Sequence, residues 1–513
     1  MPIIQPENFA RPELPELVLG IVAAVGTPLS HILGTIEGNL SSRGYSVTPL
    51  RLSRFLDHFE LSTPPPSASA PEHERLHVLM SRGNELRHSL GGGDALALFA
   101  AAEVNRYRPE GEPEFLNGRA FLLRQLKHPD EVTALRLIYG AAFQLIAVYC
   151  PEAVRLAYLH NLKKIPKDEA QKLVERDRGE DFDFGQQLTK TFHRADAFIS
   201  LDGLEDDSFG RADDQLARYF SLLFGEHPLS PNKDEYGMYL AYAAGLRSAD
   251  LSRQVGAAIQ DPSGEIISLG ANEVPAPGGG QYWSTDPDDA RDLVRRRDAN
   301  AEITFEALNE IFAELNLPGE VQSLAKKLRT ARLMNLTEFG RAVHAEMEAL
   351  LAAGRKGLSA RGTTLFTTTF PCHNCAKHII DAGILRVVYI EPYPKSLVDR
   401  LHSDAVSLPE VADSASDPNP PRPRVRFVPF TGISPTLYPL VFSTLSPEGL
   451  RLKQKDAKGY LLDKPFGLRI FERPLNYIDR ERAASLVLDE RMRISSTEST
   501  ERPEGETECP SQE

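Results

Sequence analysis

Apolar, strand-like runs alternate with amphipathic helical patterns in the first third of the chain. Leu17–Val25 is an apolar run that predicts a buried strand, and the turn Gly26-Thr-Pro28 then opens a helix through Leu40. The further elements predicted here are strands at Tyr45–Leu50 and Ala142–Cys150 and helices at His128–Tyr139 and from Pro151 onward. Strands that alternate with helices at this spacing predict a parallel, doubly wound sheet.

The second half begins with a hairpin pattern. Gln254–Gln260 and Glu265–Ala271 read as two short strands joined by the turn Asp261-Pro-Ser-Gly264, and a charged helical insertion follows at about 286–330. The elements predicted after it are a helix at His344–Ala353 ended by Gly354, a strand at Thr363–Thr369, a helix at Cys372–Ala382 ended by Gly383, and strands at Arg386–Ile390 and Arg424–Pro429. This β-β-α-β-α-β order predicts a mixed sheet with right-handed crossovers.

These patterns divide the chain into two domains and an extension. We expect a first domain at 15–240, a second at 241–445 that contains the insertion, and an extension at 446–494. The tail at 495–513 has six acidic residues, one arginine and no large aliphatic or aromatic residue, so we expect it to be disordered.

Composition and charge narrow the class of protein. With 41% hydrophobic and 25% charged residues the chain is expected to fold, and its net charge of −14 gives no electrostatic footprint for wrapping nucleic acid. The longest runs without charged residues, Leu17–Ile36 and Phe427–Pro447, contain prolines, so no membrane span is expected. Four cysteines do not make a disulfide scaffold in 513 residues. We expect a cytoplasmic protein.

One constellation of residues points to metal chemistry. His344-Ala-Glu346 precedes Pro371-Cys372-His-Asn-Cys375, and His344, Cys372 and Cys375 can supply three zinc ligands while water takes the fourth position. Both cysteines open a predicted helix, whose N-terminus favours the thiolate form that a metal needs. Zinc lowers the pKa of its bound water to about 7. Glu346 is not needed as a fourth ligand and is predicted to move protons.

Other interpretations of these residues remain. A structural zinc site would need a fourth ligand, which His373 or His378 would have to supply. A redox Cys-x-x-Cys pair would explain neither His344 nor Glu346. Cys150 ends an apolar strand and Cys509 lies in the tail, and cysteines in such places are more often inert than functional.

The spacing matches the H-x-E…P-C-x-x-C pattern and resembles zinc-dependent nucleobase deaminases, in which hydroxide on zinc attacks C4 of cytosine. By that likeness Glu346 protonates the ring nitrogen and then the departing ammonia. From about Gly245 to Tyr393 the chain resembles the cytidine/deoxycytidylate deaminase superfamily. The segments that carry this likeness are TTFPCHNCAKHIIDAGI (368–384), SRQVGAAI (252–259) and LGANEVP (269–275).

The resemblance also suggests substrate contacts. It implies that Asn272 contacts the sugar or base of a nucleoside, whereas an Asn after a strand can equally cap a turn. Glu273 replaces the glycine of the family's loop. Arg253, Tyr393 and Lys395 are candidates for phosphate contact, and each is equally well explained as a solvated surface residue.

Taken over 15–445, the chain resembles bacterial anti-phage dCTP/dCMP deaminases. The segments GANEVPAPGGGQYW (270–283), HAEMEAL (344–350), IEPYPKS (390–396) and KHPDEVTALRLIYGAAFQLIAVYCPEAVR (127–155) carry this likeness. It implies an N-terminal P-loop-kinase-like parallel sheet and a C-terminal deaminase-like α/β/α mixed sheet. It also implies conversion of dCTP and dCMP to dUTP and dUMP in defence against phage, an inhibitory RNA partner and a homo-oligomer.

The N-terminal nucleotide site is degenerate. A P-loop reads GxxxxGK[ST], whereas the segment from Gly20 to Gly26 has one residue too many between the glycines and no lysine follows. Backbone N–H groups around Gly26 and Thr27 at a helix start can still bind phosphate. A nucleotide-sensing role and a purely structural role both remain open for this domain.

Three other functions fit the sequence less well than a defensive dCTP/dCMP deaminase does. A housekeeping dCMP deaminase would not need the long first domain. A polynucleotide deaminase is disfavoured by the net charge of −14 and by the lack of an aromatic-rich basic groove. An inert zinc-binding module would have no use for the acid Glu346.

Overall fold

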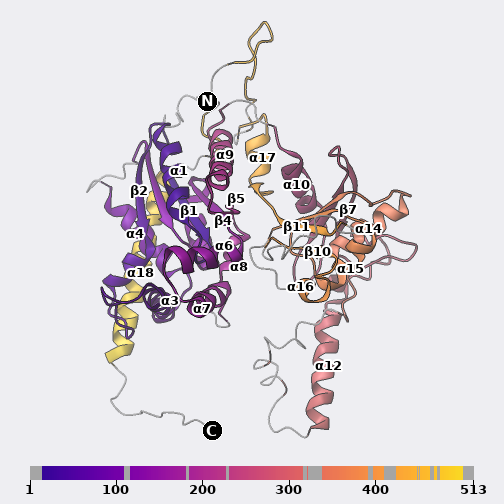
Figure 1. The fold of residues 1–513 in the computed structure, drawn as a ribbon, viewed down its shortest axis with the longest axis horizontal. Helices are drawn as coiled ribbons and strands as arrows, with labels where there is room; N and C mark the ends of the chain where they lie inside the picture. The colour runs from indigo at the N-terminus through magenta and orange to yellow at the C-terminus, as the bar shows by residue number, and fades with distance from the viewer. Residues whose placement is uncertain are drawn as a thin grey trace, which may run out of the picture. The chain divides into compact units, whose positions relative to one another are not determined.

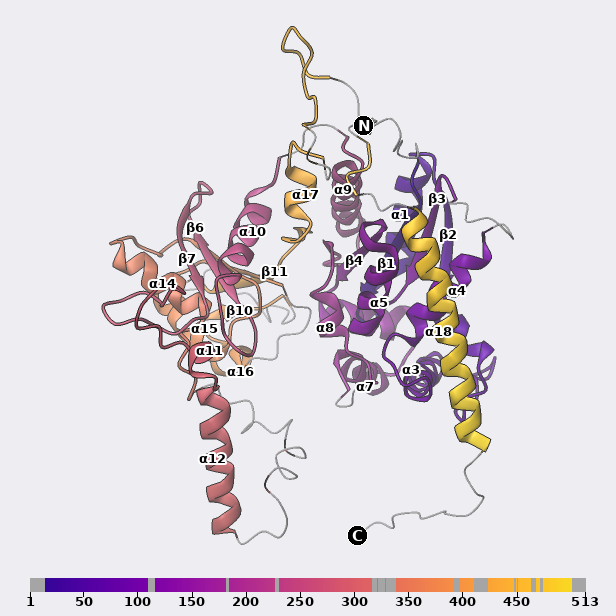
Figure 2. The same ribbon diagram turned by 180° about the vertical axis from the view of Figure 1, so that it is seen from behind.

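The computed structural model describes most of the chain (Figures 1 and 2). The residues it describes are 14–108, 116–180, 184–226, 230–315, 321, 328, 338–390, 397–409, 423–446, 449, 451–462, 467–470 and 474–500. The chain forms two compact units, of which unit 1 comprises Met1–Pro228 and Ser443–Glu513 and unit 2 comprises Leu229–Phe442.

Unit 1 is built on a parallel sheet, as the alternating pattern predicts. Its strands are β1 (Leu17–Ala23), β2 (Ser46–Arg51), β3 (Arg119–Arg124), β4 (Phe143–Tyr149) and β5 (Ala197–Ser200). They lie in the order β2-β3-β1-β4-β5, and each neighbouring pair is parallel. The central strands β1 and β4 are buried throughout, which explains their continuous apolar sequence.

Helices connect these strands. Their bounds are α1 (Leu29–Ser41), α2 (Leu52–Phe55), α3 (Glu72–Ser89), α4 (Ala95–Arg106), α5 (Pro129–Tyr139), α6 (Glu152–Ala157), α7 (Lys167–Arg178), α8 (Leu188–Phe192), α9 (Asp206–Leu223) and α18 (Pro474–Thr500). Short 3₁₀ turns lie at Leu56–His58 and Gly140–Ala142, and a π-helical turn at Tyr158–Leu162 follows α6. The predicted cap of α5 is confirmed, because His128 and Glu131 form a reciprocal capping box at its start.

Helix α18 packs against α4 and α5 of unit 1 (Figure 2). Arg108 lies between two carboxylates there, 2.8 Å from Glu16 Oε1 and 2.6 Å from Glu481 Oε2 of α18, and all three side chains are buried. The last part of the chain therefore includes a helix of unit 1, whereas the sequence suggests a separate extension. The helix also runs to Thr500, so a disordered tail from 495 is wrong for its first six residues; no proline or glycine interrupts it before Pro503.

Unit 2 contains a mixed sheet. Its strands are β6 (Gly256–Gln260), β7 (Ile266–Ala271), β8 (Thr364–Thr367), β9 (Arg386–Tyr389), β10 (Val406–Ser407) and β11 (Val425–Pro429). The short strand β12 (Gly432–Ile433) lies in the same segment of the chain but is not part of this sheet. The strands of the sheet lie in the order β10-β11-β9-β8-β6-β7, in which β6 is antiparallel to both neighbours and the other pairs are parallel. The predicted hairpin turn is present, since the Asp261 carboxylate accepts from the N–H of Gly264 and Glu265.

Helices cover both faces of this sheet. Their bounds are α10 (Lys233–Gly245), α11 (Asp292–Arg295), α12 (Ala299–Glu314), α14 (Ala345–Arg355), α15 (His373–Asp381), α16 (Val398–Leu401) and α17 (Tyr438–Phe442). Leu365 on β8 packs in one core with residues of α14 and α15, while its neighbour Phe366 lies against Gly237 of α10. Because successive strand residues point to opposite faces, α10 covers one face and α14 and α15 cover the other.

Two sequence predictions differ from the fold in detail. Helix α14 does not end at Gly354 but runs on to Arg355, and Gly357, with φ of 71°, provides the left-handed turn that follows. The domain boundary predicted at 240 falls inside α10, which packs on β6 and β7 and so belongs to unit 2. Among the described residues, no helix combines the length and the apolar character needed to cross a bilayer.

Candidate metal centre

Two helix starts hold the three predicted metal ligands. His344 is the N-cap of α14, and Cys372 is the N-cap of α15, whose first turn contains Cys375. The Cys372 Sγ accepts a hydrogen bond from the backbone N–H of Cys375 at 3.4 Å, which fixes the turn of the Cys-x-x-Cys segment. Helices α14 and α15 contact each other, so residues 28 positions apart in sequence meet at one point.

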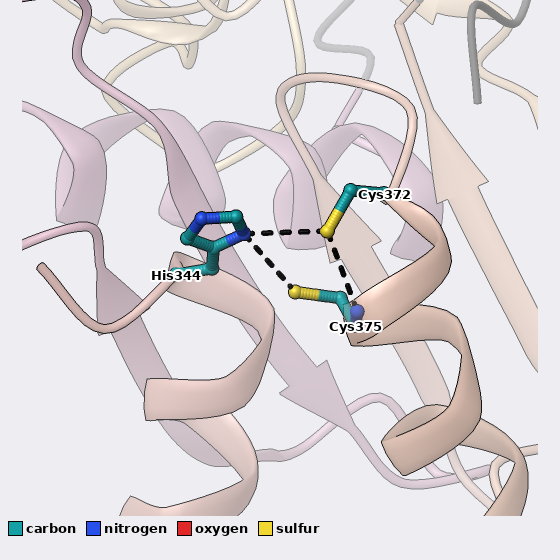
Figure 3. Close-up of side chains that lie close together, drawn as sticks. All are labelled: His344, Cys372 and Cys375. Carbon is teal, nitrogen blue, oxygen red and sulfur yellow. Dashed lines mark hydrogen bonds between the residues drawn. The ribbon is translucent and has the colours of Figure 1, made fainter. Parts of the chain in front are cut away.

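The three ligand atoms converge (Figure 3). His344 Nδ1 lies 3.4 Å from Cys372 Sγ and 3.4 Å from Cys375 Sγ. A tetrahedral zinc ion with Zn–S of about 2.3 Å and Zn–N of about 2.0 Å separates its sulfur and nitrogen ligands by about 3.5 Å. The donor types and their spacing therefore fit a zinc ion.

The fourth coordination position receives no protein donor from the described residues. The metal-binding group found among them consists of His344, Cys372 and Cys375, without His373 or His378. His378 is exposed on α15. A structural zinc with four protein ligands would need one of these histidines in the group, so the arrangement favours a site with an open position.

Glu346 lies beside the three ligands. Its side chain is 3% exposed, and its Oε2 lies 3.6 Å from Cys375 Sγ. Burial raises the pKa of the Glu346 carboxyl, and the neighbouring Cys372 thiolate raises it further. A metal cation held by the three ligands would act in the opposite direction, because it stabilises a nearby carboxylate. The carboxyl group is thus placed to take up and release a proton.

The two cysteine thiols affect each other's pKa in opposite directions. The hydrogen bond from Cys375 lowers the pKa of the Cys372 thiol and raises the pKa of Cys375. The hydrogen bond to Cys372 in turn raises the pKa of the His344 imidazole. Thiols and an imidazole whose pKa values depend on one another are typical of metal sites, because a metal binds these groups in place of their protons.

The loop that carries Asn272 lies next to His344. Glu273 and Val343 form an antiparallel backbone bridge, which brings the end of β7 to the start of α14. The Asn272 amide accepts from Val255 N at 2.7 Å and donates to the Arg253 carbonyl at 2.9 Å. Asn272 thus tethers the 253–255 segment, and its contact with a nucleoside stays a prediction.

In the sequence, Glu273 differs from the family only in replacing the glycine of the loop, and no contact is predicted for it. In the structure its buried carboxylate accepts from Ala249 N at 2.8 Å and from Val274 N at 2.9 Å, and Arg291 lies 3.7 Å away. Only the glycine-to-glutamate departure signals this residue in the sequence, because Ala249 and Arg291 lie far from it along the chain.

The remaining predicted contacts are placed only in part. Arg253 is exposed. Its positive charge lowers the pKa of His344, against the larger opposite effect of the hydrogen bond to Cys372. Tyr393 and Lys395 lie outside the described residues. Gly26 and Thr27 lie in unit 1, at the turn between β1 and α1.

Comparison with known proteins gives a consistent result for unit 2. The profile of the cytidine and deoxycytidylate deaminase zinc-binding region matches residues 231–391. The deoxycytidylate deaminase of Enterobacteria phage T4 is 31% identical over 168 residues, which are 31% of this chain and 78% of the phage protein. A probable deoxycytidylate deaminase of Drosophila melanogaster is 31% identical over 157 residues, which are 31% of this chain and 58% of the fly protein.

Among solved structures, the dCMP deaminase of cyanophage S-TIM5 in complex with dCMP and dUMP aligns with 34% of this chain and 93% of its own. The sequence identity is 20% and the TM-score is 0.21.

Proposed function

Because the chain belongs to the deoxycytidylate deaminase family and is a hydrolytic deaminase, we propose that His344, Cys372 and Cys375 hold a catalytic zinc ion and that Glu346 moves the protons of the reaction. The observation that carries this proposal is the convergence of an imidazole nitrogen and two sulfurs at zinc spacing beside a buried carboxyl group.

The zinc ion and the protein side chains would have different roles in the reaction. Bound zinc supplies a Lewis acid that makes a water molecule nucleophilic at neutral pH. Glu346 would accept a proton from the attacking water and deliver it to the ring nitrogen N3 of cytosine; it would then accept the remaining proton from the hydroxyl group now on C4 and deliver it to the departing amino group. The C4–O bond forms, the C4–N bond breaks, and ammonia leaves a uracil product.

The substrate that we propose is a free deoxycytidine nucleotide, dCMP or dCTP. Support for a free nucleotide comes from the family and from the net charge of −14, which disfavours a polynucleotide substrate. Incubating the purified full chain with dCMP, dCTP, CMP, CTP, cytidine and single-stranded DNA and separating the products tests this directly. Uracil product from dCMP or dCTP is expected; conversion of the DNA alone would contradict the proposal.

We further propose a defensive role in the cytoplasm, with depletion of deoxycytidine nucleotides on phage infection. The support is the resemblance of most of residues 15–445 to anti-phage deaminases, which also suggests a P-loop-kinase-like unit 1, a homo-oligomer and an inhibitory RNA. A plaque assay that compares cells expressing the chain with cells expressing its Glu346→Gln variant tests the role. Equal plaque numbers would overturn it.

A further inference from the structure

Three consecutive arginines lie at the end of the short helix α11 in unit 2. Arg295, Arg296 and Arg297 all have exposed side chains, and α12 begins shortly after them (Figure 2). The net charge of the whole chain is −14, and a field of that sign repels an anionic nucleotide. The exposed cations after α11 thus have the opposite sign to the chain as a whole.

The segment that carries these arginines is attached near the start of α14. Arg341 Nη1 donates to Asp292 Oδ1 at 2.5 Å and to the Ala290 carbonyl at 3.0 Å. Arg341 lies three residues before His344, the first of the proposed zinc ligands. Three residues span at most about 11 Å, so the start of α11 lies near the metal centre.

A second contact attaches the other end of the same segment. The Ser252 hydroxyl donates to Oδ2 of Asp298, which directly follows the third arginine, at 3.3 Å. The carbonyl of the next residue, Arg253, accepts from Asn272, and the loop that carries Asn272 lies next to His344. Both ends of the segment 292–298 are therefore attached to parts of the chain that lead to the metal centre.

Two of the three arginines have unpaired charges. Arg295 and Arg296 form no side-chain hydrogen bond or ion pair with any residue that the structure describes. The nearest carboxylates along the sequence are already engaged, because Asp292 pairs with Arg341 and Asp298 caps α12. The positive charge of Arg295 and Arg296 is thus available to an anionic ligand.

The backbone of Arg296 adopts a left-handed conformation, with φ of 59° and ψ of 29°. Glycine and asparagine adopt this conformation most readily, and glycine is the usual residue where a left-handed turn ends a helix. The side chain of Arg296 is exposed, so packing does not require it either. Neither the turn nor the core therefore explains an arginine at this position.

We propose that Arg295 and Arg296 bind the outer phosphates of the deaminase substrate and so give dCTP preference over dCMP. The proposal rests on the deaminase function proposed above and adds its substrate preference. Both nucleotides have the phosphate next to the sugar, so only groups that contact the outer phosphates can distinguish them. A guanidinium group suits this task because it presents several N–H donors to phosphate oxygens in a fixed, planar arrangement.

Steady-state kinetics of the full chain with dCMP, dCDP and dCTP tests the proposal. The wild type should have its lowest KM for dCTP. In the double variant Arg295→Ala/Arg296→Ala, the KM for dCTP should rise about tenfold or more and the KM for dCMP less than about twofold, while kcat stays unchanged. The variant Arg295→Lys/Arg296→Lys keeps the charges and should retain most of the preference for dCTP.

A matched control removes two cations elsewhere in unit 2. Lys356 and Arg361 are exposed and follow the C-terminal end of α14, whereas His344 lies at its N-terminus. The 11 residues of α14 span about 16 Å, which exceeds the screening length of about 8 Å at physiological ionic strength. Lys356→Ala/Arg361→Ala should therefore leave all three KM values within about twofold of the wild type.

Failure of this proposal is distinguishable from failure of the deaminase function. An unchanged KM for dCTP, equal KM shifts for the three nucleotides, or a lowest wild-type KM for dCMP would overturn the role of the arginines while deamination itself continues. Product from none of the three nucleotides would overturn the deaminase function and this proposal with it.

Calorimetric titration with dCMP and dCTP measures the same preference without turnover. The protein used is the Glu346→Gln variant, with and without the two alanine substitutions. The substitutions should weaken the binding of dCTP about tenfold or more and leave the binding of dCMP nearly unchanged. Equal weakening for both nucleotides would contradict contact with the outer phosphates.

Discussion

The carboxylate Oε2 of Glu346 lies 3.6 Å from Sγ of Cys375, beside the ligand atoms rather than among them. A carboxylate in the fourth ligand position would close a zinc site and exclude water, whereas one beside an open position can exchange protons with whatever binds there. Because Glu346 is proposed to carry protons and not to bind the metal, its replacement should affect the reaction but not metal binding.

Replacing Glu346 with glutamine should abolish deamination and leave metal binding intact. The amide keeps the shape of the side chain but cannot carry a proton, so turnover of dCMP should fall by about 10²–10⁴-fold. The measurements are uracil product by chromatography and zinc content by atomic absorption. Turnover close to that of the wild type would refute the role given to Glu346.

The matched control is Glu348→Gln on the same helix. Glu348 is also buried, but it pairs with Arg355 in the last turn of α14 and is not part of the candidate metal-binding group. Its loss should lower the melting temperature while leaving the turnover of the folded enzyme within about twofold of the wild type.

Removing the metal should stop the reaction and expose two thiols. Chelation is expected to abolish deamination, and added zinc should restore it, because His344, Cys372 and Cys375 provide the ligands. Iodoacetamide should then label Cys372 and Cys375 only after chelation. Activity that survives complete removal of zinc would contradict the proposed mechanism.

Cys150 is an internal control for that labelling. It is a free thiol, 4% exposed, and burial raises its pKa to about 12. Since the thiolate is the reactive form, Cys150 should stay unlabelled at pH 8 with or without zinc. Peptide mass spectrometry separates it from the other two; its labelling in the chelated protein would indicate unfolding of unit 1.

Replacing Asn272 with alanine should destabilise unit 2. The variant leaves the buried N–H of Val255 and the carbonyl of Arg253 without their partner, which costs about 1–3 kcal/mol of unfolding free energy. Denaturant unfolding measures this, and Asn309→Ala on the exposed surface of α12 is the control. An additional rise in KM for dCMP would support substrate contact, and an unaltered unfolding free energy would contradict the tether.

Replacing Arg108 with methionine should destabilise unit 1 strongly at high pH. The change leaves Glu16 and Glu481 buried without their shared cation, which costs about 3–5 kcal/mol. The control is Arg106→Met, because Arg106 is exposed. Equal losses for the two variants at pH 8 would contradict the importance of the buried pairing.

The sign of the pH effect follows from Glu481. Burial raises the pKa of Glu481 to about 7; Arg108 lowers this pKa and the charge of Glu16 raises it. The folded state then binds more protons than the unfolded state between the usual glutamate pKa and about pH 7, so this group's contribution to stability falls as pH rises through that window. The deficit of Arg108→Met should accordingly shrink as pH is lowered from 8 to 5.5.

Local patterns account for much of what was predicted. The three proposed metal ligands lie at helix starts that the flanking residues signal, and the hairpin turn at Asp261 has its own sequence signature. Strand β3, by contrast, was not predicted, because Arg119 and Arg124 bound a short apolar run. Its place between β1 and β2 is a matter of tertiary pairing.

Long-range contacts explain the rest. Glu481 and Arg108 are 373 residues apart, so no periodicity could have assigned α18 to unit 1. Arg51 and Arg124 likewise come from the ends of separate strands, and only the parallel ladder of β2 and β3 sets them beside each other.

Helix α18 belongs to unit 1 although it follows unit 2 in the sequence. Unit 2 is therefore one continuous segment of the chain, whereas unit 1 consists of two segments. A frameshift or stop codon shortly after residue 442 would still encode every residue of unit 2, yet it would deprive Arg108 of one of its two counter-ions and strip α4 and α5 of a packing helix. A truncation after residue 442 would therefore destabilise unit 1, although the residues directly before the truncation belong to unit 2.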